Sequence, residues 1–327
     1  MSSIVSTANR FAHSAAGLFF EPRLLILIFH RVHPVPDPLF PGEPDARRFD
    51  SLLGLIKSSF RVLSLRAAVT ALRNRSLPPR SLVITFDDGY ADNADVALPL
   101  LRRHGLCATF FVSTGFLDGA GCMWNDALIE SVRTTTVREL DLGDWGLGRH
   151  SVLSISDRQR LIEVLLGHGK YLPPRERNEF VKEIQARVMV RGDFPVLMMT
   201  SAQVRALHGA GMEIGGHTIG HPILTKLALE ESRLEIRGGR ERLQQVVDAP
   251  VDLFAYPNGR PQRDYDQRHV ALVKELGFLA AVSTASGAAS AKDDMFQLPR
   301  YTPWGRTSAI WAARLLRNRL QKVSDAA

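Results

Sequence analysis

Two pairs of polar residues have the types and the spacing that a catalytic metal site needs. Asp87 and Asp88 directly follow the apolar run 81–86, and neighbouring side chains leave a strand on opposite sides, so the two carboxylates can serve different purposes. His217 and His221 are four residues apart, which lets both imidazoles bind one metal ion from one turn or tight loop. With Asp88 they make a set that leaves coordination positions open for water and substrate.

The metal that we expect for this set is one divalent ion, with zinc as the first choice. Cobalt, nickel, iron and manganese accept the same nitrogen and carboxylate ligands, so the ligand types alone do not separate these metals. An Asp-Asp-Gly turn at the end of a strand is common by itself. The interpretation as a catalytic site therefore depends on the carboxylates and the histidine pair occurring together.

The elements that must position these residues alternate between strands and helices. The chain has 327 residues, of which 45% are hydrophobic and 23% charged, which is typical of a globular protein. Alternation of this kind predicts a parallel sheet. Apolar strands are expected at 24–29, 81–86, 108–113, 213–216, 253–256 and 280–283, and helices at 94–104, 230–247 and 267–276. If the sheet closes into a barrel, its strand ends gather His30, Asp87, His217 and Tyr256 at one rim.

A third motif, Phe-Ala-Tyr-Pro-Asn-Gly at 254–259, ends a predicted strand in a sharp turn. The motifs Thr-Phe-Asp-Asp-Gly at 85–89, His-Thr-Ile-Gly-His at 217–221 and Tyr-Pro-Asn-Gly at 256–259 follow one another along the chain. In these motifs and their order, residues 24–300 resemble the polysaccharide deacetylases, the NodB-homology group of carbohydrate esterases. The resemblance implies a distorted (β/α) barrel. It also implies metal-dependent removal of acetyl groups from N-acetylglucosamine units of a glycan.

The resemblance also assigns roles to individual residues. It implies that Asp88, His217 and His221 bind the metal, that Asp87 is the general base, and that the backbone N–H of Asn258 helps to hold the oxyanion. The metal lowers the pKa of bound water and polarises the acetamide carbonyl, while the base takes a proton from the attacking water. Negative charge on the former carbonyl oxygen is then stabilised by the metal and by a fixed N–H.

The sequence departs from the family pattern at two positions. Many members carry an arginine where this chain has Ala255, and a late histidine that acts as general acid, whereas no histidine follows His269 here. Phe-His-Arg-Val at 29–32 resembles the start of the exopolysaccharide-type branch, so His30 is our candidate acid; the alternatives are another role in the site and a structural role. Arg300, in Leu-Pro-Arg at 298–300, is the candidate partner of Asp87, with a salt bridge elsewhere on the barrel as its alternative.

Residues 115–196 interrupt the alternating pattern with charged, helical sequence. We interpret this stretch as an insertion over the rim or side of the barrel, where it can shape access of the substrate. The candidate residues for binding an N-acetylated saccharide are Tyr90, Trp124, Asp126, Tyr256 and Pro257. For Trp124, packing within the insertion is the alternative.

The remaining segments are an N-terminal arm, 1–23, and a basic amphipathic helix in 305–327 that follows the barrel of 24–304. The formal charge of +7 is concentrated near the end of the chain. The apolar face of the last helix could lie on an anionic membrane surface or pack on the barrel. Nucleic acid is not an expected partner, because aromatic and basic residues do not interleave. Without a recognisable secretory signal, we expect a cytoplasmic protein, at the inner face of the membrane if the helix binds there.

Two other functions remain open from the sequence. A barrel of the same type could act as an amidohydrolase on a C–N bond outside sugars. The absence of the usual arginine and late histidine also leaves open a glycan-binding barrel with impaired catalysis. Activity on acetamido sugars separates the first alternative from deacetylation, and glycan binding without acetate release would support the second.

Overall fold

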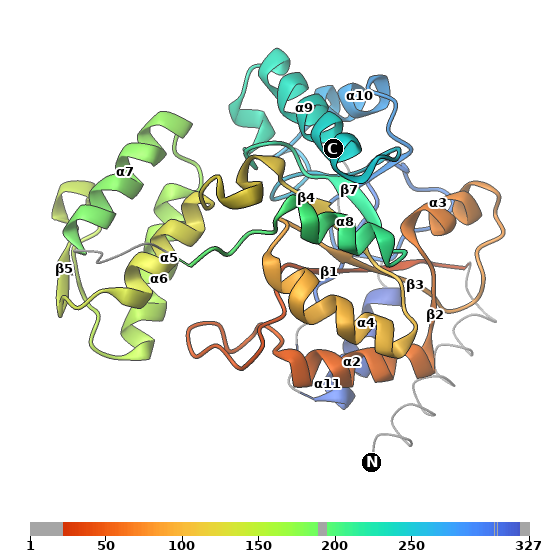
Figure 1. The fold of residues 1–327 in the computed structure, drawn as a ribbon, viewed down its shortest axis with the longest axis horizontal. Helices are drawn as coiled ribbons and strands as arrows, with labels where there is room; N and C mark the ends of the chain where they lie inside the picture. Colours follow the sequence, from red (N-terminus) through yellow and green to blue (C-terminus); the bar gives the residue numbers. More distant parts are fainter. Residues whose placement is uncertain (1–21, 189–194, 304, 306, 321–327) are drawn as a thin grey trace.

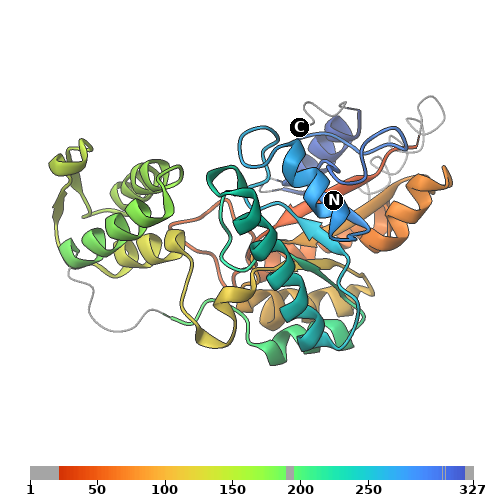
Figure 2. The ribbon, with the colours of Figure 1, turned by 90° about the horizontal axis from the view of Figure 1, so that it is seen from above.

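The computed structural model describes residues 22–188, 195–303, 305 and 307–320 (Figure 1). The expected N-terminal arm therefore lies almost entirely outside the described residues. A curled parallel sheet forms the centre of the main body, and a separate group of helices stands beside it (Figures 1 and 2).

The sheet has seven parallel strands in the order β1-β3-β4-β7-β8-β9, with β2 paired to the start of β3. All positions of the apolar strands β1 and β3 are buried, as expected where a parallel sheet is covered on both faces. The strands are β1 (Leu25–Phe29), β2 (Arg61–Val62), β3 (Ser81–Phe86), β4 (Thr109–Val112), β7 (Glu213–Gly216), β8 (Leu253–Ala255) and β9 (Ala280–Val282).

An extended segment, 298–301, lies between the two edge strands β9 and β1. Leu298 makes a parallel bridge with Val282, and Tyr301 makes one with Leu27. The Tyr301 N–H donates to the Ile26 carbonyl at 2.8 Å. This segment links the edges of the curled sheet, so the distorted (β/α) barrel expected from the sequence is confirmed, and Arg300 is placed within it.

Helices cover the outside of the sheet (Figure 1). Side-chain caps fix where two of them begin: the Asp45 carboxylate accepts from the Arg48 N–H, and the Ser64 hydroxyl accepts from the Ala67 N–H. A π-helical turn, Asn93–Ala97, precedes α4. The barrel helices are α2 (Ala46–Ser59), α3 (Leu65–Arg73), α4 (Leu98–His104), α8 (Ser201–Gly209), α9 (Leu229–Val247) and α10 (Gln267–Glu275).

The middle of the predicted insertion forms a lobe with its own hydrophobic core. Its elements are α5 (Trp124–Thr134), β5 (Glu139–Asp141), β6 (Arg149–Ser151), α6 (Ile155–Gly169) and α7 (Pro174–Arg187). Leu128, Leu161 and Phe180 are fully buried within that core. The chain returns to the barrel where Met198 bridges Tyr90. The lobe is thus attached close to the carboxyl end of β3.

The last described helix, α11 (Ser308–Leu320), packs on α2 and β1. Trp311 is 3% exposed and Leu315 is fully buried in the barrel core. Of the two alternatives for this helix, its described part shows the packed arrangement, while membrane association is untested. Within the described ranges, no helix is long and apolar enough to span a bilayer.

Candidate active site

The two aspartates are placed by the end of β3. The Asp87 N–H donates to the Phe29 carbonyl at 2.9 Å, which extends the β1–β3 ladder by one residue. Asp88 then adopts a φ of 76° and Gly89 a φ of 92°, a left-handed conformation that is costly for a residue with a side chain. A Cβ at Gly89 would lie 2.9 Å from a Val112 methyl group. This sharp turn sends the two carboxylates in different directions.

The histidines lie on the loop that follows β7. Thr218 and His221 both have a positive φ, 69° and 54°. Glu235, on α9, accepts hydrogen bonds from the N–H groups of Ile219 and Gly220 at 3.0 and 2.8 Å. Side-chain anchoring therefore holds the strained loop in the one conformation that brings both imidazoles to the same point.

Asp88, His217 and His221 converge on one point. The Nε2 atoms of both histidines lie 3.3 Å from Asp88 Oδ1. Asp88 Oδ1 is buried without a hydrogen-bond partner among the described residues, and the ligand atoms of the three residues lie within 4.8 Å of one another. His217 Nδ1 is 2.8 Å from the Ala255 carbonyl oxygen, which directs Nε2 towards Asp88. This donor set fits one divalent ion.

The charges in the cluster favour an ionised carboxylate. Burial raises the pKa of Asp88, but the interactions with His221 and His217 outweigh burial and hold that pKa well below its ordinary value. Burial lowers the pKa of His221 to about 4, despite the nearby Asp88. A neutral imidazole and an ionised carboxylate are the protonation states that bind a metal. For His217, burial lowers the pKa but Asp87 and Asp88 outweigh burial, so its net pKa is raised.

Arg300 lies on the extended segment 298–301 and binds Asp87 through two hydrogen bonds. Its NH1 and NH2 atoms donate to Asp87 Oδ1 and Oδ2, both at 2.6 Å, and its Nε donates to the Ser283 carbonyl at 2.9 Å. Both side chains of the pair are buried. Burial raises the pKa of Asp87, but Arg300 and His217 outweigh it and the net pKa is lowered. Asp87 is therefore held as an oriented carboxylate 4.0 Å from His217 Nε2.

These groups open onto a cavity of about 440 Å³ between the barrel and the lobe. On the barrel side, the candidate residues that line it are His30, Asp87, Asp88, Tyr90, His217, His221 and Asn258. From the lobe come Trp124, Asn125, Asp126, Ile129, Leu166, Gly167 and Lys170. His30 is exposed within this lining. No described acceptor takes a hydrogen bond from the N–H of Asn258, which has a φ of 60°.

Two of the predicted substrate-binding residues do not line the cavity. Tyr256 is fully buried, and its ring stacks on Tyr265 with centroids 3.8 Å apart. Pro257 is buried as well. The predicted contact of these two side chains with substrate stays a prediction, and in this structure both residues are buried outside the cavity lining. The next residue, Asn258, is the one that reaches the cavity.

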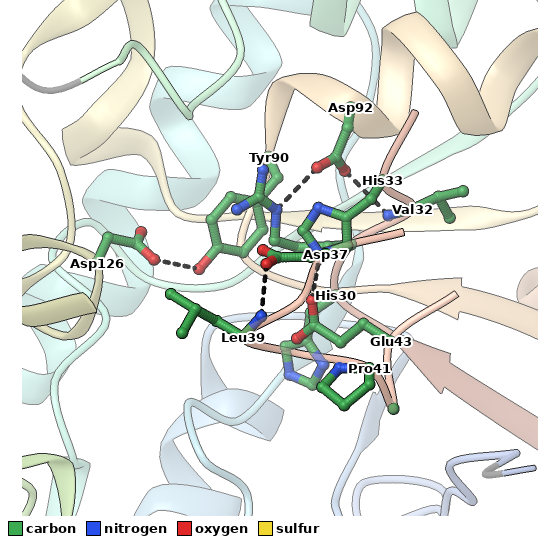
Figure 3. A network of polar contacts seen from close by, with 12 residues as sticks. His30, Val32, His33, Asp37, Leu39, Pro41, Glu43, Tyr90, Asp92 and Asp126 are labelled. Carbon is green, nitrogen blue, oxygen red and sulfur yellow. Dashed lines mark hydrogen bonds and ion pairs between the residues drawn. The ribbon is translucent and has the colours of Figure 1, made fainter. Parts of the chain in front are cut away.

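A polar network that sequence reasoning missed joins the barrel to the lobe (Figure 3). The Arg31 guanidinium donates to Asp92 at 2.8 Å and lies over the Tyr90 ring, 4.9 Å from its centroid. The Tyr90 hydroxyl donates to Asp126 Oδ1 at 3.0 Å. Arg31 also lines the cavity. Its only signal in the sequence is its place beside His30 after the first strand.

The fold and the site together define a (β/α) barrel with a candidate metal centre at the carboxyl ends of its strands. The family model for polysaccharide deacetylases matches residues 74–281. The chain therefore belongs to the polysaccharide deacetylase family, as its motifs indicate.

Individual relatives are distant. The Bacillus subtilis (strain 168) protein YxkH is 20% identical over 234 residues, which cover 72% of this chain but only 55% of YxkH. The chain thus spans about half the length of this curated relative. The Streptococcus pyogenes deacetylase PplD, solved in complex with acetate, has a TM-score of 0.62 at 19% identity and covers 91% of this chain and 99% of its own. IcaB from Ammonifex degensii has a TM-score of 0.57 at 16% identity, with coverages of 89% and 96%.

Proposed function

We propose that this protein is a metal-dependent hydrolase that removes N-acetyl groups from N-acetylglucosamine-type units of a glycan or glycan precursor. The observation that carries the proposal is the pairing of buried Asp87 with Arg300 beside the Asp88–histidine cluster, in the lining of a cavity. A carboxylate next to a metal-ligand set is what activation of water requires. Membership of the polysaccharide deacetylase family supports an acetylated saccharide as the substrate.

Each residue of the site has a separate role in the proposed hydrolysis. A divalent ion, zinc by preference, held by Asp88, His217 and His221 would supply Lewis acidity towards water and the acetyl carbonyl. Asp87 accepts the proton of the attacking water at a carboxylate oxygen, and Arg300 keeps that carboxylate ionised and oriented. The N–H of Asn258 faces the oxygen that becomes negatively charged.

The leaving amine needs a proton, and His30 is the residue that we propose to donate it. His30 lines the cavity together with Asp87 and Asp88. Across the part of the chain that the structure describes, no other histidine besides the two proposed metal ligands lines this cavity. Protonation of the nitrogen converts a poor leaving group into a good one.

Acetate release tests the reaction. We would incubate zinc-loaded protein with a panel of N-acetylglucosamine oligosaccharides, and in parallel with small cyclic amides, and measure the acetate or the opened ring. Acetate from the saccharides supports the proposal. Ring opening without acetate release would replace it with an amidohydrolase that acts outside sugars, and glycan binding without turnover would replace it with a binding barrel.

The leaving group of the substrate tests the role of His30. We expect His30→Gln to lower turnover of N-acetylated saccharides by about 10²- to 10⁴-fold, because the amine must be protonated as it leaves. On 4-nitrophenyl acetate, whose phenolate leaves without a proton, the same variant should keep most of its activity. Asp87→Asn should lose both activities. Full saccharide turnover by His30→Gln with unchanged metal content would refute the acid role.

A further inference from the structure

Asp126 lines the cavity and has one buried carboxylate oxygen without a hydrogen-bond partner among the described residues. The residue lies in the first turn of α5, in the lobe, and is 4% exposed. It lines the same cavity as Asp88 and the histidines. Lobe and barrel therefore meet at this carboxylate, beside the cavity that the proposed metal ligands also line.

The two oxygens of Asp126 are in different situations. Oδ1 accepts the hydrogen bond from the Tyr90 hydroxyl at 3.0 Å, as Figure 3 shows. Oδ2 is buried and has no hydrogen-bond partner among the described residues. A buried carboxylate oxygen without a donor is costly. The tyrosine fixes the carboxylate so that one acceptor is ready for a donor that the chain does not provide.

The nearby cations are already engaged. Arg31 donates to Asp92 and stacks on the Tyr90 ring. Arg133, on the same helix as Asp126, binds Glu130 and Asp37. Neither arginine donates to Oδ2, so this oxygen is available to a donor from a molecule that enters the cavity.

The surroundings of Oδ2 fit a sugar hydroxyl. Trp124 and Asn125, which directly precede Asp126, line the cavity as well. An indole ring offers an apolar surface to the C–H groups of a pyranose, and an amide and a carboxylate bind its hydroxyl groups. The Arg177 guanidinium lies over the Trp124 ring at 5.2 Å and helps to fix its position.

We propose that Asp126 Oδ2 accepts a hydrogen bond from one hydroxyl group of the saccharide unit that enters the cavity, so that the lobe supplies a specificity-determining contact. Tyr90 acts as a positioning residue for this contact, since its hydroxyl holds the other carboxylate oxygen. This inference rests on the proposed function for the class of substrate. It goes further by naming the acceptor atom and the group that it recognises.

The contact is tested by comparing two forms of the protein on a parent glycoside and its deoxy analogues, in the manner of a double-mutant cycle. The probes are the methyl glycoside of N-acetylglucosamine and its 3-, 4- and 6-deoxy analogues, with zinc-loaded wild-type protein and Asp126→Asn. The amide can still accept the Tyr90 hydrogen bond but places a donor where Oδ2 was. We expect Asp126→Asn to lower kcat/KM for the parent glycoside by about 10- to 100-fold, the effect of leaving one buried polar group without its hydrogen-bond partner. For one deoxy analogue, the one that lacks the hydroxyl group bound by Oδ2, kcat/KM should be nearly the same for wild type and Asp126→Asn.

Two controls separate this contact from a loss of structure. Glu163→Gln removes an exposed carboxylate on α6 and should leave kcat/KM and the thermal midpoint unchanged. Tyr90→Phe should weaken discrimination among the analogues in the same direction as Asp126→Asn but less. Equal losses for all analogues in Asp126→Asn, or no loss at all, would overturn the proposal.

Binding keeps this test independent of catalysis. If the wild-type protein releases no acetate, the proposed function fails. Saturation-transfer NMR with the same four glycosides then shows whether Asp126 makes the proposed contact with a sugar hydroxyl group. A deoxy analogue that binds wild type more weakly than the parent, with that difference lost in Asp126→Asn, supports the contact. Equal binding of the four glycosides to the wild-type protein, or no binding of any, overturns it.

Discussion

Arg300 holds Asp87 by two hydrogen bonds of 2.6 Å across 213 residues of sequence. The arginine reaches the carboxylate from the segment that joins β9 to β1, and neither side chain is exposed to solvent by more than 3%. A planar guanidinium that binds both carboxylate oxygens fixes the orientation as well as the charge. Where the resemblance leads one to expect an arginine at Ala255, this chain supplies the same kind of partner from another strand position.

Replacing Arg300 should therefore damage both catalysis and stability. We expect Arg300→Gln to lower the free energy of unfolding by about 3–5 kcal/mol, because a buried carboxylate loses its counter-charge. Burial then dominates and raises the pKa of Asp87, so the acidic limb of the kcat/KM profile should move to higher pH. Arg300→Lys should lie between wild type and Arg300→Gln. Urea unfolding and a pH–rate profile measure the two effects.

A surface pair of the same geometry provides the control. Arg66 binds Asp252 through two hydrogen bonds of 2.6 Å, but its side chain is 49% exposed. Arg66→Gln should change stability by no more than about 1 kcal/mol, since exposed ion pairs contribute little. The pH profile should not move. Equal stability losses in Arg66→Gln and Arg300→Gln would contradict our account of the buried pair.

The three proposed ligands should be needed together for metal binding. We expect Asp88→Asn, His217→Gln and His221→Gln each to reduce the zinc content, measured by mass spectrometry, from about one ion per chain to below about one tenth of that. The rise in thermal midpoint on adding zinc, which follows from binding to the folded state alone, should disappear with it. His208→Gln, an exposed histidine on α8, should bind zinc like the wild type. Full zinc content in Asp88→Asn would refute the ligand set.

Two adjacent glycines on α9 should respond differently to alanine. A Cβ at Gly239 would lie 2.7 Å from the Thr218 carbonyl oxygen, in the backbone of the histidine loop. We expect Gly239→Ala to lower stability by about 1–3 kcal/mol and to weaken zinc binding, since the loop must move. At Gly238 the closest atom, also at 2.7 Å, is the flexible end of Ile219. Gly238→Ala should keep zinc affinity and stability; titrations and urea unfolding compare the two.

Asp126 should make the stability of the metal-free protein depend on pH. Burial raises the pKa of Asp126 from 3.8 to about 7, with a lowering contribution from Tyr90 and a raising one from Asp88; Arg31 and Glu130 have smaller opposing effects. The folded protein thus holds this proton more tightly than the unfolded chain, so the stabilisation is complete below about pH 4 and is lost as the pH rises to about 7.

Asp126→Asn, which stays uncharged, should therefore become progressively more stable than wild type over this range. The difference should grow by at most about 1.4 kcal/mol per pH unit and level off above about pH 7. Urea unfolding of both proteins in the presence of a chelator measures it, and titration of groups distant from Asp126 cancels in the difference. A difference that does not change with pH would show that the carboxyl group is not held neutral by the fold.

The residues that could be predicted from sequence are those attached directly to strand ends. Asp87, Asp88, His217 and His221 follow apolar runs, and the carboxyl ends of parallel strands meet at one rim, so their convergence follows from local pattern and topology. The helices 230–247 and 267–276 were also clear, because their apolar residues recur at helical spacing.

Other features depend on contacts that no local pattern encodes. Tyr90, Asp126 and Arg31 belong to three separate segments, and only the placement of the lobe brings them together. The short strands β5 and β6 and the helix α8 were not foreseen, since three residues of strand or two turns of helix carry little periodicity. The stacking of Tyr256 on Tyr265 could not be foreseen either, because Tyr265 lies in a loop.

The measurement that tests the central claim most directly is acetate release from an N-acetylglucosamine oligosaccharide by zinc-loaded wild-type protein and by Asp87→Asn, with zinc content determined in both samples. Our account predicts release by the wild type and a loss of at least about 10²-fold in the variant, although its Asp88–histidine cluster still holds zinc. Undiminished release by Asp87→Asn, or none from the zinc-filled wild type, would contradict the account.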